Sequence, residues 1–503
     1  MKKWPKYPTI YEINTWVWLS DLSTKYGNPI DLSSVPAADW DSMAGYGYDG
    51  VWLMGVWERS PAGIAIVNRN ENLLNDFRRA LPDFRAQNNV GSPYCVRRYV
   101  VDEHLGGPNG LAIARQELAQ RKAKLVLDFV PNHVAPDHPW VKEHPEYFVR
   151  GTAEDASRDP ASWAAVAGNV YARGRDPYSP AWPDVLQLNT FQPSLRQAVI
   201  QTLLNIEGQC DAIRCDMAML LLNAIFERTW GAHVGQAPAA EYWANVISAV
   251  KKKHPGFLFI AEAYWGLEWE LQQHGFDFCY DKKLYDRLEQ DNAESIHLHL
   301  CADPLYQSKI MRFIESHDAP RAAATFSTTQ ERAAPAASST VMVARLFHEG
   351  QFEGRKIKLP ASLSRRPTEP VDKAMLNSYE GLLAAIDSPV FRDGQWILCA
   401  CSGSPDNASF ENLAAWSWLK DEYRYLIVIN LSDSNAQGRI HIPWQDAAGE
   451  EWCLQDAVSG VTYERNGDKM TGPGLYVELG PWNYSFFQLK EEIDGNEPLP
   501  ISA

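Results

Sequence analysis

The chain has 503 residues and a formal net charge of −16, from 47 basic and 63 acidic side chains. This acidic balance argues against a nucleic-acid partner, because phosphate binding needs a cationic surface that releases counterions. No stretch approaches the roughly 20 apolar residues that a transmembrane helix needs, so we expect no membrane partner, and the length predicts more than one structural unit.

The N-terminal stretch, MKKWPKYPTIYEIN, lacks an apolar run of signal-peptide length. The eight cysteines are scattered, with no CxxC pair and no spacing typical of a metal knuckle. Free, buried thiols suit a reducing compartment. The sequence therefore predicts a cytoplasmic protein.

Eight short apolar runs are typical of buried parallel β-strands, and several precede segments of helical period. The runs cover residues 9–18, 50–57, 124–134, 211–220, 258–266, 276–281, 309–318 and 342–350. Helices are expected after Gly110 and Pro193, where apolar residues recur at i, i+3 and i+4. The pattern predicts an α/β fold in which residues 1–136 and 193–388 form a closed (β/α)8 barrel of the TIM type.

Two further parts are expected outside the barrel. Residues 137–192 are rich in Pro, Gly, Asp and Trp and lack a long helical repeat, which predicts a small inserted subdomain after strand three. From about residue 390 short alternating strands follow one another, so residues 389–492 are expected to form an antiparallel β-sandwich domain. Residues 493–503 are predicted to be a frayed tail.

Polar residues gather at the ends of four predicted strands. They are Asp128, Asn132 and His133, then Arg214 and Asp216, then Glu262, and finally Glu315, His317, Asp318 and Arg321. Barrel active sites lie at the C-terminal ends of the strands, so these side chains should converge on one mouth. Converging carboxylates are what glycosidic cleavage needs, because one protonates the leaving oxygen while another meets the anomeric carbon.

The motifs DFVPNH, AIRCDMAML, AEAYW and FIESHD resemble, in order and spacing, the four conserved regions of the alpha-amylase family, glycoside hydrolase family 13. The resemblance covers nearly the whole chain. It implies that Asp216 is the nucleophile and that Glu262 is the general acid and base of a retaining reaction. Asp318 matches the third family acid, which holds sugar hydroxyls and favours ring distortion.

The resemblance also implies substrate-binding residues. His133 and His317 match the two family histidines that bind the sugar at the cleaved bond, and Tyr94 stands where the family often stacks a tyrosine, with Tyr99 as the alternative. Arg214 lies two residues before Asp216 on the same strand face, so its charge is expected to keep Asp216 ionised. Trp57, after strand two, is expected at the rim of the site, either binding substrate or closing the loop.

The chain departs from the family pattern at two places. Met219 and Leu220 stand where many amylases have Lys-His on the leaving-group side, which puts ordinary starch hydrolysis in doubt and favours transfer to a sugar. Gln187 stands where the family's fifth region usually has an Asp that joins a calcium site with Asn132, and Asp184 lies three residues earlier. Calcium binding by Asn132 and Asp184 is therefore an open expectation.

The resemblance implies a hydrolase that cleaves α-glucosidic bonds of malto-oligosaccharides or related α-glucans by double displacement, and we expect no organic cofactor. One alternative is an α-glucan transglycosidase or a trehalose-synthase-like isomerase, in which a sugar replaces water as acceptor. The other is a non-catalytic carbohydrate-binding relative, although such proteins typically lose the acids that this chain keeps. The sequence leaves linkage, chain length and oligomeric state open.

Overall fold

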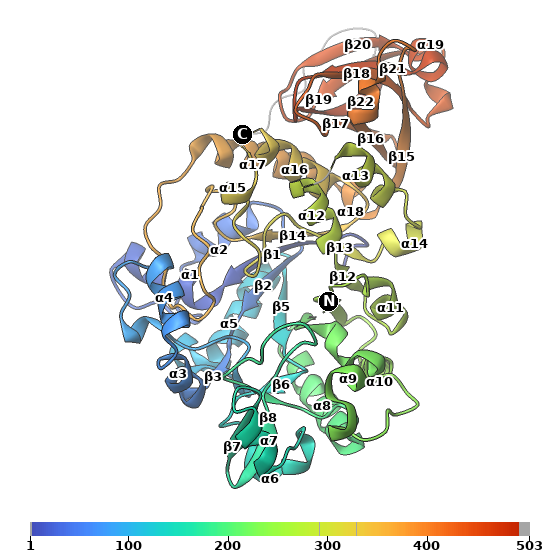
Figure 1. The fold of residues 1–503 in the computed structure, drawn as a ribbon. Helices are drawn as coiled ribbons and strands as arrows, with labels where there is room; N and C mark the ends of the chain where they lie inside the picture. The colour runs from blue at the N-terminus through green and yellow to red at the C-terminus, as the bar shows by residue number, and fades with distance from the viewer. Residues whose placement is uncertain (1–2, 291, 328, 492–503) are drawn as a thin grey trace. The chain divides into compact units, whose positions relative to one another are not determined.

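The computed structural model describes residues 3–290, 292–327 and 329–491 (Figure 1). The chain divides into two compact units. The first holds the described residues up to Lys282 together with Pro304–Thr325 and Val343–Asp372. The second holds Lys283–Asp303, Phe326–Met342 and the described residues from Lys373 on.

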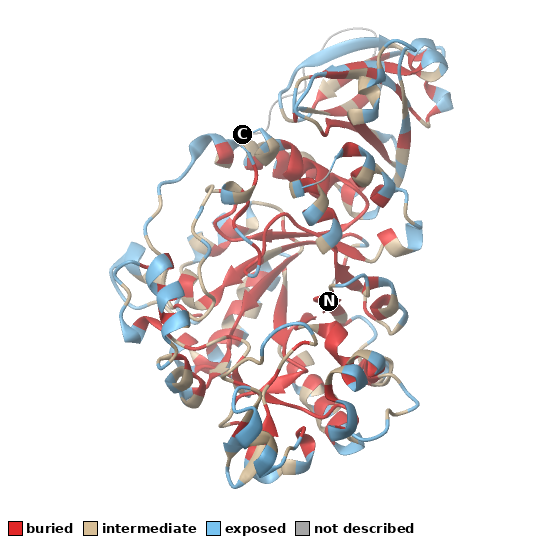
Figure 2. Ribbon diagram, viewed as in Figure 1, coloured by how far each residue is buried: buried red, intermediate tan, exposed pale blue. Residues whose placement is uncertain are grey.

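The first unit is built on a closed barrel of eight parallel strands, with the order β1-β14-β13-β12-β11-β10-β5-β2. The strands are β1 (Thr9–Asn14), β2 (Gly50–Met54), β5 (Lys124–Phe129), β10 (Ala212–Cys215), β11 (Leu258–Ala261), β12 (Phe278–Tyr280), β13 (Ile310–Arg312) and β14 (Ala344–His348). Each lies within one of the eight predicted runs, so the predicted barrel is confirmed. Figure 2 shows these strands almost entirely buried, as expected where both faces of a parallel sheet are covered.

Helices connect the strands of the first unit. They are α1 (Thr15–Tyr26), α2 (Ala37–Ala44), α3 (Pro61–Val67), α4 (Glu71–Ala80), α5 (Gly107–Gln120), α8 (Pro193–Glu207), α9 (Asn223–Trp230), α10 (Tyr242–Lys253), α11 (Glu268–Gln273), α14 (Pro304–Gln307) and α15 (Ala322–Thr325). Helices α5 and α8 are the two predicted crossover helices. In α8 a proline opens the first turn, and Leu195, Val199, Leu203 and Ile206 form the buried stripe expected of a helix packed on a barrel.

Two excursions leave the barrel. After β2, β3 (Trp57–Arg59) pairs with β4 (Val96–Val101) in a two-stranded antiparallel sheet, which the sequence pattern did not predict. The predicted insertion contains α6 (Trp140–Glu143), α7 (Ala153–Arg158) and a second hairpin of β7 (Trp163–Val166) and β8 (Asn169–Ala172). The turn residues of this hairpin, Ala167 and Gly168, both have positive φ, as a tight two-residue turn requires. β9 (Leu186–Gln187) then pairs with β6 (His133–Val134), which ties the insertion to the end of β5.

The second unit contains an antiparallel sheet of eight strands, in the order β20-β19-β22-β17-β16-β15-β18-β21. The strands are β15 (Gln395–Ser402), β16 (Leu413–Lys420), β17 (Tyr423–Asn430), β18 (Ala436–His441), β19 (Glu451–Asp456), β20 (Thr462–Asn466), β21 (Leu475–Leu479) and β22 (Tyr484–Glu491). The predicted antiparallel β domain is confirmed. This domain was expected to be a sandwich of two sheets. Because β15 pairs with both β16 and β18, the strands instead form one continuous sheet around a shared core.

Helices complete the second unit. They are α12 (Lys282–Gln290), α13 (Ala293–Leu300), α16 (Gln330–Thr340), α17 (Lys373–Ile386), α18 (Pro389–Asp393) and α19 (Gly467–Lys469). Thr340, at the end of α16, accepts hydrogen bonds from the indoles of Trp416 and Trp418 in β16. The second unit thus includes α12, α13, α16 and α17, which the predicted domain boundary at residue 389 placed in the barrel. The predicted tail, residues 493–503, lies outside the described residues.

Candidate active site

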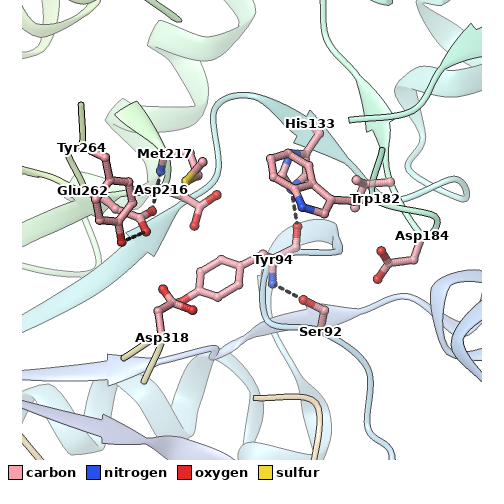
Figure 3. Close-up of a pocket in the computed structure, with 11 residues that line it drawn as sticks. Ser92, Tyr94, His133, Trp182, Asp184, Asp216, Met217, Glu262, Tyr264 and Asp318 are labelled. Carbon is pink, nitrogen blue, oxygen red and sulfur yellow. Dashed lines mark hydrogen bonds between the residues drawn. The ribbon is translucent and has the colours of Figure 1, made fainter. Parts of the chain in front are cut away.

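The predicted acids lie where the barrel strands end. Asp216 follows β10, Glu262 follows β11, and Asp318 lies six residues beyond β13. All three line one cavity of about 390 Å³ (Figure 3), within the size range of small-molecule sites. The lining residues are Ser92, Tyr94, His133, Trp182, Asp184, Val185, Asp216, Met217, Glu262, Tyr264 and Asp318.

Arg214 joins two of these acids. It lies in β10 two residues before Asp216, so both side chains point to the same face of the strand. Nη1 of Arg214 donates to Oδ1 of Asp216 at 2.7 Å, and Nη2 lies 2.7 Å from Oε2 of Glu262. The guanidinium is buried and lies over the rings of Trp52 and Tyr94. One fixed cation therefore holds the two carboxylates facing the same space.

Burial raises the pKa of Asp216. The charge of Arg214 opposes this shift, in the direction that the sequence analysis expected, and the negative charge of Glu262 adds to it. The net direction of the Asp216 pKa is upward, while Arg214 favours the ionised form as expected. A buried cation shared by two carboxyl groups favours a state in which at least one of them is ionised.

Two donors orient Glu262. The hydroxyl of Tyr264 donates to Oε1 at 2.8 Å, and the backbone N–H of Met217 donates to Oε2 at 2.6 Å. Met217 has φ of +43°, in the left-handed region, which costs an ordinary residue about 1–2 kcal/mol. That strained backbone aims the N–H at the acid. Neither residue was predicted, although Tyr264 stands two positions after Glu262, a spacing that often shares a strand face.

His317 links Asp318 to the barrel wall. Its Nε2 lies 2.8 Å from Oδ2 of Asp318 and 2.5 Å from the Tyr94 hydroxyl, while Nδ1 contacts the fully buried carboxylate of Glu12 in β1. Burial opposes the charged imidazolium, but Asp318 and Glu12 outweigh it and raise the pKa of His317 to about 10. The imidazolium thus carries a proton on each nitrogen and bridges two carboxylates.

The Asp318 carboxylate faces the cavity and is 49% exposed. Desolvation opposes its ionisation, yet the charges of His317 and Arg214 hold the pKa of this carboxyl well below its usual range. A permanently ionised acid that opens into a cavity can accept hydrogen bonds from ligand hydroxyls.

His133 and Tyr94 lie in the cavity lining, as predicted, and Nε2 of His133 lies 3.2 Å from the carbonyl oxygen of Tyr94. Burial lowers the pKa of His133 to about 4, so this ring is neutral at physiological pH. Tyr99, the alternative to Tyr94, instead donates its hydroxyl hydrogen bond to the carbonyl oxygen of Val130.

The predicted calcium ligands do not fit that role. The amides of Asn132 and Gln187 pair with each other, at 2.9 and 3.1 Å, which occupies the side-chain oxygen of Asn132. Asp184 lines the cavity instead. Within residues 3–290, 292–327 and 329–491 no group of three or more His, Cys, Asp or Glu side chains is placed to hold a metal ion. The Gln at position 187, in place of the family Asp, accounts for this difference.

Three other side chains contribute to the core rather than to the cavity lining. Trp57 is 1% exposed, and its indole donates to the carbonyl oxygen of Asp128 at 2.7 Å, so it supports the end of β5 instead of contacting a ligand. Met219 and Leu220 are buried in the short helical turn after Asp216. Neither side chain is among the residues that line the cavity, which include Met217 and Tyr264 instead.

Fold and site together define a (β/α)8-barrel protein with acidic side chains gathered in one cavity at the strand ends. No family model matches the chain. A maltogenic alpha-amylase from Thermotoga neapolitana superposes with a TM-score of 0.68 at 19% identity, covering 96% of this chain and 98% of its own. A trehalulose synthase superposes with a TM-score of 0.66 at 14% identity, covering 97% of this chain and 100% of its own. These neighbours confirm the predicted resemblance to the alpha-amylase family as a likeness of fold.

The relatives found by sequence match only part of this chain. An alpha-1,4-glucan:maltose-1-phosphate maltosyltransferase from Bifidobacterium longum is 27% identical over 233 residues, which are 45% of this chain and 25% of that protein. The chain thus matches about a quarter of this relative.

In the described part of the chain, every helix is too short or too polar to cross a membrane.

Proposed function

We propose that this protein is a retaining glycoside hydrolase that acts on α-glucosidic bonds of malto-oligosaccharides or related α-glucans. The observation that carries the proposal is the guanidinium of Arg214, which contacts Asp216 and Glu262 within one cavity. Paired carboxylates beside a sugar-sized cavity are the machinery of double displacement at an anomeric carbon.

In the first step a carboxylate oxygen of Asp216 attacks the anomeric carbon, while Glu262 gives its proton to the departing glycosidic oxygen. The bond to the leaving group breaks, and a covalent glycosyl ester forms on Asp216. In the second step Glu262 takes a proton from water, whose oxygen displaces Asp216 and restores the starting anomeric configuration. The hydrogen bonds from Tyr264 and Met217 keep Glu262 beside the bond that breaks. The chain's own residues supply both groups, so we propose no organic cofactor.

Asp318 and His317 have a different role in this proposal. The ionised carboxylate and the imidazolium offer one acceptor and one cation to the hydroxyls of the ring at the cleaved bond. Hydrogen bonds that strengthen as the ring flattens stabilise the oxocarbenium-like transition state. His133 and Tyr94, which also line the cavity, add further contacts to the sugar.

The charge of the cavity favours an uncharged donor. Its described lining residues include four carboxylates, those of Asp184, Asp216, Glu262 and Asp318, and neither lysine nor arginine. The sequence relatives are named for maltose 1-phosphate. The neighbouring cations, Arg214 and His317, are already paired with three of these carboxylates. A phosphate would therefore find no free cation in the described lining and would meet repulsion, so we propose that the donor here is a neutral glucoside.

Transfer is the second candidate, because the sequence relatives are named as transferases and one structural neighbour as a trehalulose synthase. Incubation with maltose, trehalose, sucrose, isomaltose, maltooligosaccharides and glycogen, followed by NMR, separates the two. Glucose released as the α-anomer with no new disaccharide supports hydrolysis, and a new disaccharide supports transfer. Absence of turnover on all six would contradict the enzyme proposal and favour a binding protein.

We also propose a cytoplasmic location. All eight cysteines are free, including the buried Cys210, Cys215 and Cys279, which suits a reducing compartment.

A further inference from the structure

A second cavity is lined by the insertion and by α3. Its volume is about 460 Å³, within the range of about 300–1,000 Å³ that small-molecule sites occupy. We call it the insertion pocket, and none of its lining residues is shared with the catalytic cavity. These residues are Ile66, Pro136, Ala156, Pro160, Trp163, Ala164, Ala165, Val166, Arg173 and Leu186.

The insertion pocket differs from the catalytic cavity in polarity and charge. Arg173 is the one charged residue in its described lining, and the other nine residues are aliphatic or aromatic. The described lining of the catalytic cavity instead has four carboxylates and neither lysine nor arginine. A sugar needs several polar groups to pair with its hydroxyls, and the side chains of the insertion pocket do not supply them. The pocket therefore suits a ligand with an apolar body and one anionic group.

Arg173 is held in place without a carboxylate partner. Its backbone N–H donates to the carbonyl oxygen of Ser162 at 2.8 Å, and Nη1 donates to the carbonyl oxygen of Pro183. In the described part of the chain no ion pair joins this guanidinium to a carboxylate. Burial lowers the pKa of Arg173, and the charge of Asp184 opposes that shift. A partly buried cation of this kind is stabilised by an anion that binds beside it.

One short segment separates the two cavities. Trp182, Asp184 and Val185 line the catalytic cavity. The next residue, Leu186, lines the insertion pocket and forms an antiparallel β-bridge with Arg173. The backbone thus fixes this wall before any ligand arrives, which lowers the entropic cost of binding.

We propose that the insertion pocket binds a small aliphatic monocarboxylic acid, whose carboxylate pairs with Arg173 and whose chain packs against the apolar lining. A carboxylate matches the two-pronged guanidinium and carries a single charge. A phosphate monoester carries nearly two charges at neutral pH, and the second would face the field of Asp184. The inference goes beyond the proposed function and does not depend on it, because binding requires no turnover.

Calorimetric titration of the full-length protein tests the two parts of the ligand separately. Decanoate should bind one-to-one, and at least about tenfold more tightly than decanol, which lacks the charge. Affinity should rise about fourfold for each CH2 added between hexanoate and decanoate, because the chain becomes buried. Equal binding of decanoate and decanol, no dependence on chain length, or no binding of decanoate would each overturn the proposal.

Substitution of Arg173 locates the site. Arg173→Gln removes the charge, so it should weaken decanoate binding about tenfold or more and leave decanol binding unchanged. Arg175→Gln is the matched control, because Arg175 contacts the carbonyl oxygen of Thr229 and the ring of Trp230, outside the pocket lining. It should bind decanoate as the wild type does. Decanoate binding that Arg173→Gln leaves unchanged would contradict the site.

A second pair of variants leaves Arg173 and its contact with Pro183 in place, in case Arg173→Gln does not fold. Ile66→Glu introduces a carboxylate into the half-buried lining and removes apolar surface, so decanoate binding should be lost. Ala65→Glu adds the same charge at the neighbouring exposed position of α3 and should bind as the wild type does. Wild-type affinity in Ile66→Glu protein would overturn the proposal.

Discussion

Replacing Arg214 by methionine tests the electrostatics of the site. The guanidinium is 1% exposed and lies among four carboxylates. These are Asp128, Asp216, Glu262 and Asp318, at 3.9, 2.7, 2.7 and 3.7 Å. Methionine keeps much of the side-chain volume and removes the charge, so the buried acids lose their shared partner.

The expected loss of stability is large. Removing one partner of a buried ion pair typically costs about 3–5 kcal/mol, because the other charge stays buried and uncompensated. Because 1 kcal/mol shifts Tm by roughly 2–4 °C in domains of 150–250 residues and by less in a larger unit, Tm should fall by several degrees at pH 7.5. Lower pH should narrow the difference, because the acids of the variant take up protons and the uncompensated charge disappears.

Thermal unfolding followed by circular dichroism between pH 5 and 8 measures both effects. Arg214→Lys should recover much of the Tm but little of the activity, since an ammonium keeps the charge and loses the two-pronged geometry. Arg98→Met is the control, because Arg98 pairs with Glu58 at the surface and should change Tm little. An Arg214→Met protein as stable as the wild type across this pH range would refute the reasoning.

Three further predictions concern other parts of the site. Glu12→Gln should lower the pKa of His317 from about 10. The stability that the imidazolium contributes is complete below the unfolded pKa near 6.5 and is lost as pH rises through the folded pKa. The Tm of the variant should therefore begin to fall at a lower pH than the Tm of the wild type. Superimposable Tm profiles would contradict this linkage. Glu262→Gln should lose far more kcat/KM on maltose than on 4-nitrophenyl α-glucoside, whose leaving group needs no proton, and equal losses would remove Glu262 as the acid. The kcat/KM of the wild type should be at least about 100-fold higher for maltose than for maltose 1-phosphate, and Asp184→Asn should lower that ratio. A higher kcat/KM for maltose 1-phosphate would contradict the proposal that the donor is a neutral glucoside.

Much of the barrel was predictable because its strands are short apolar runs with a polar residue at the end. Asp216, Glu262 and Asp318 could then be chosen as candidate site residues, because barrel active sites lie at the strand ends. Their convergence needs only that the barrel closes, and it does so through pairing of β1 with β14.

Contacts between distant segments were not predictable. Glu12 and His317 are 305 residues apart, and no local pattern marks Glu12 as other than an acid in a strand. Met219 and Leu220 matched a family position that faces substrate, yet the turn opened by Met217 buries both. The contact of Tyr178 with Trp265 depends on how the insertion and the loop after β11 meet. The helices of the second unit are separated in sequence from the sheet that belongs to the same unit.

Covalent trapping tests the central claim most directly. A 5-fluoro-α-glucosyl fluoride slows both steps of double displacement, so the glycosyl ester should accumulate on the wild-type protein and appear in intact mass spectra. A single label is expected, on the peptide that contains Asp216, and no label is expected on Asp216→Asn protein. A label on another residue, or turnover of α-glucosyl fluoride that releases β-glucose without any ester, would contradict it.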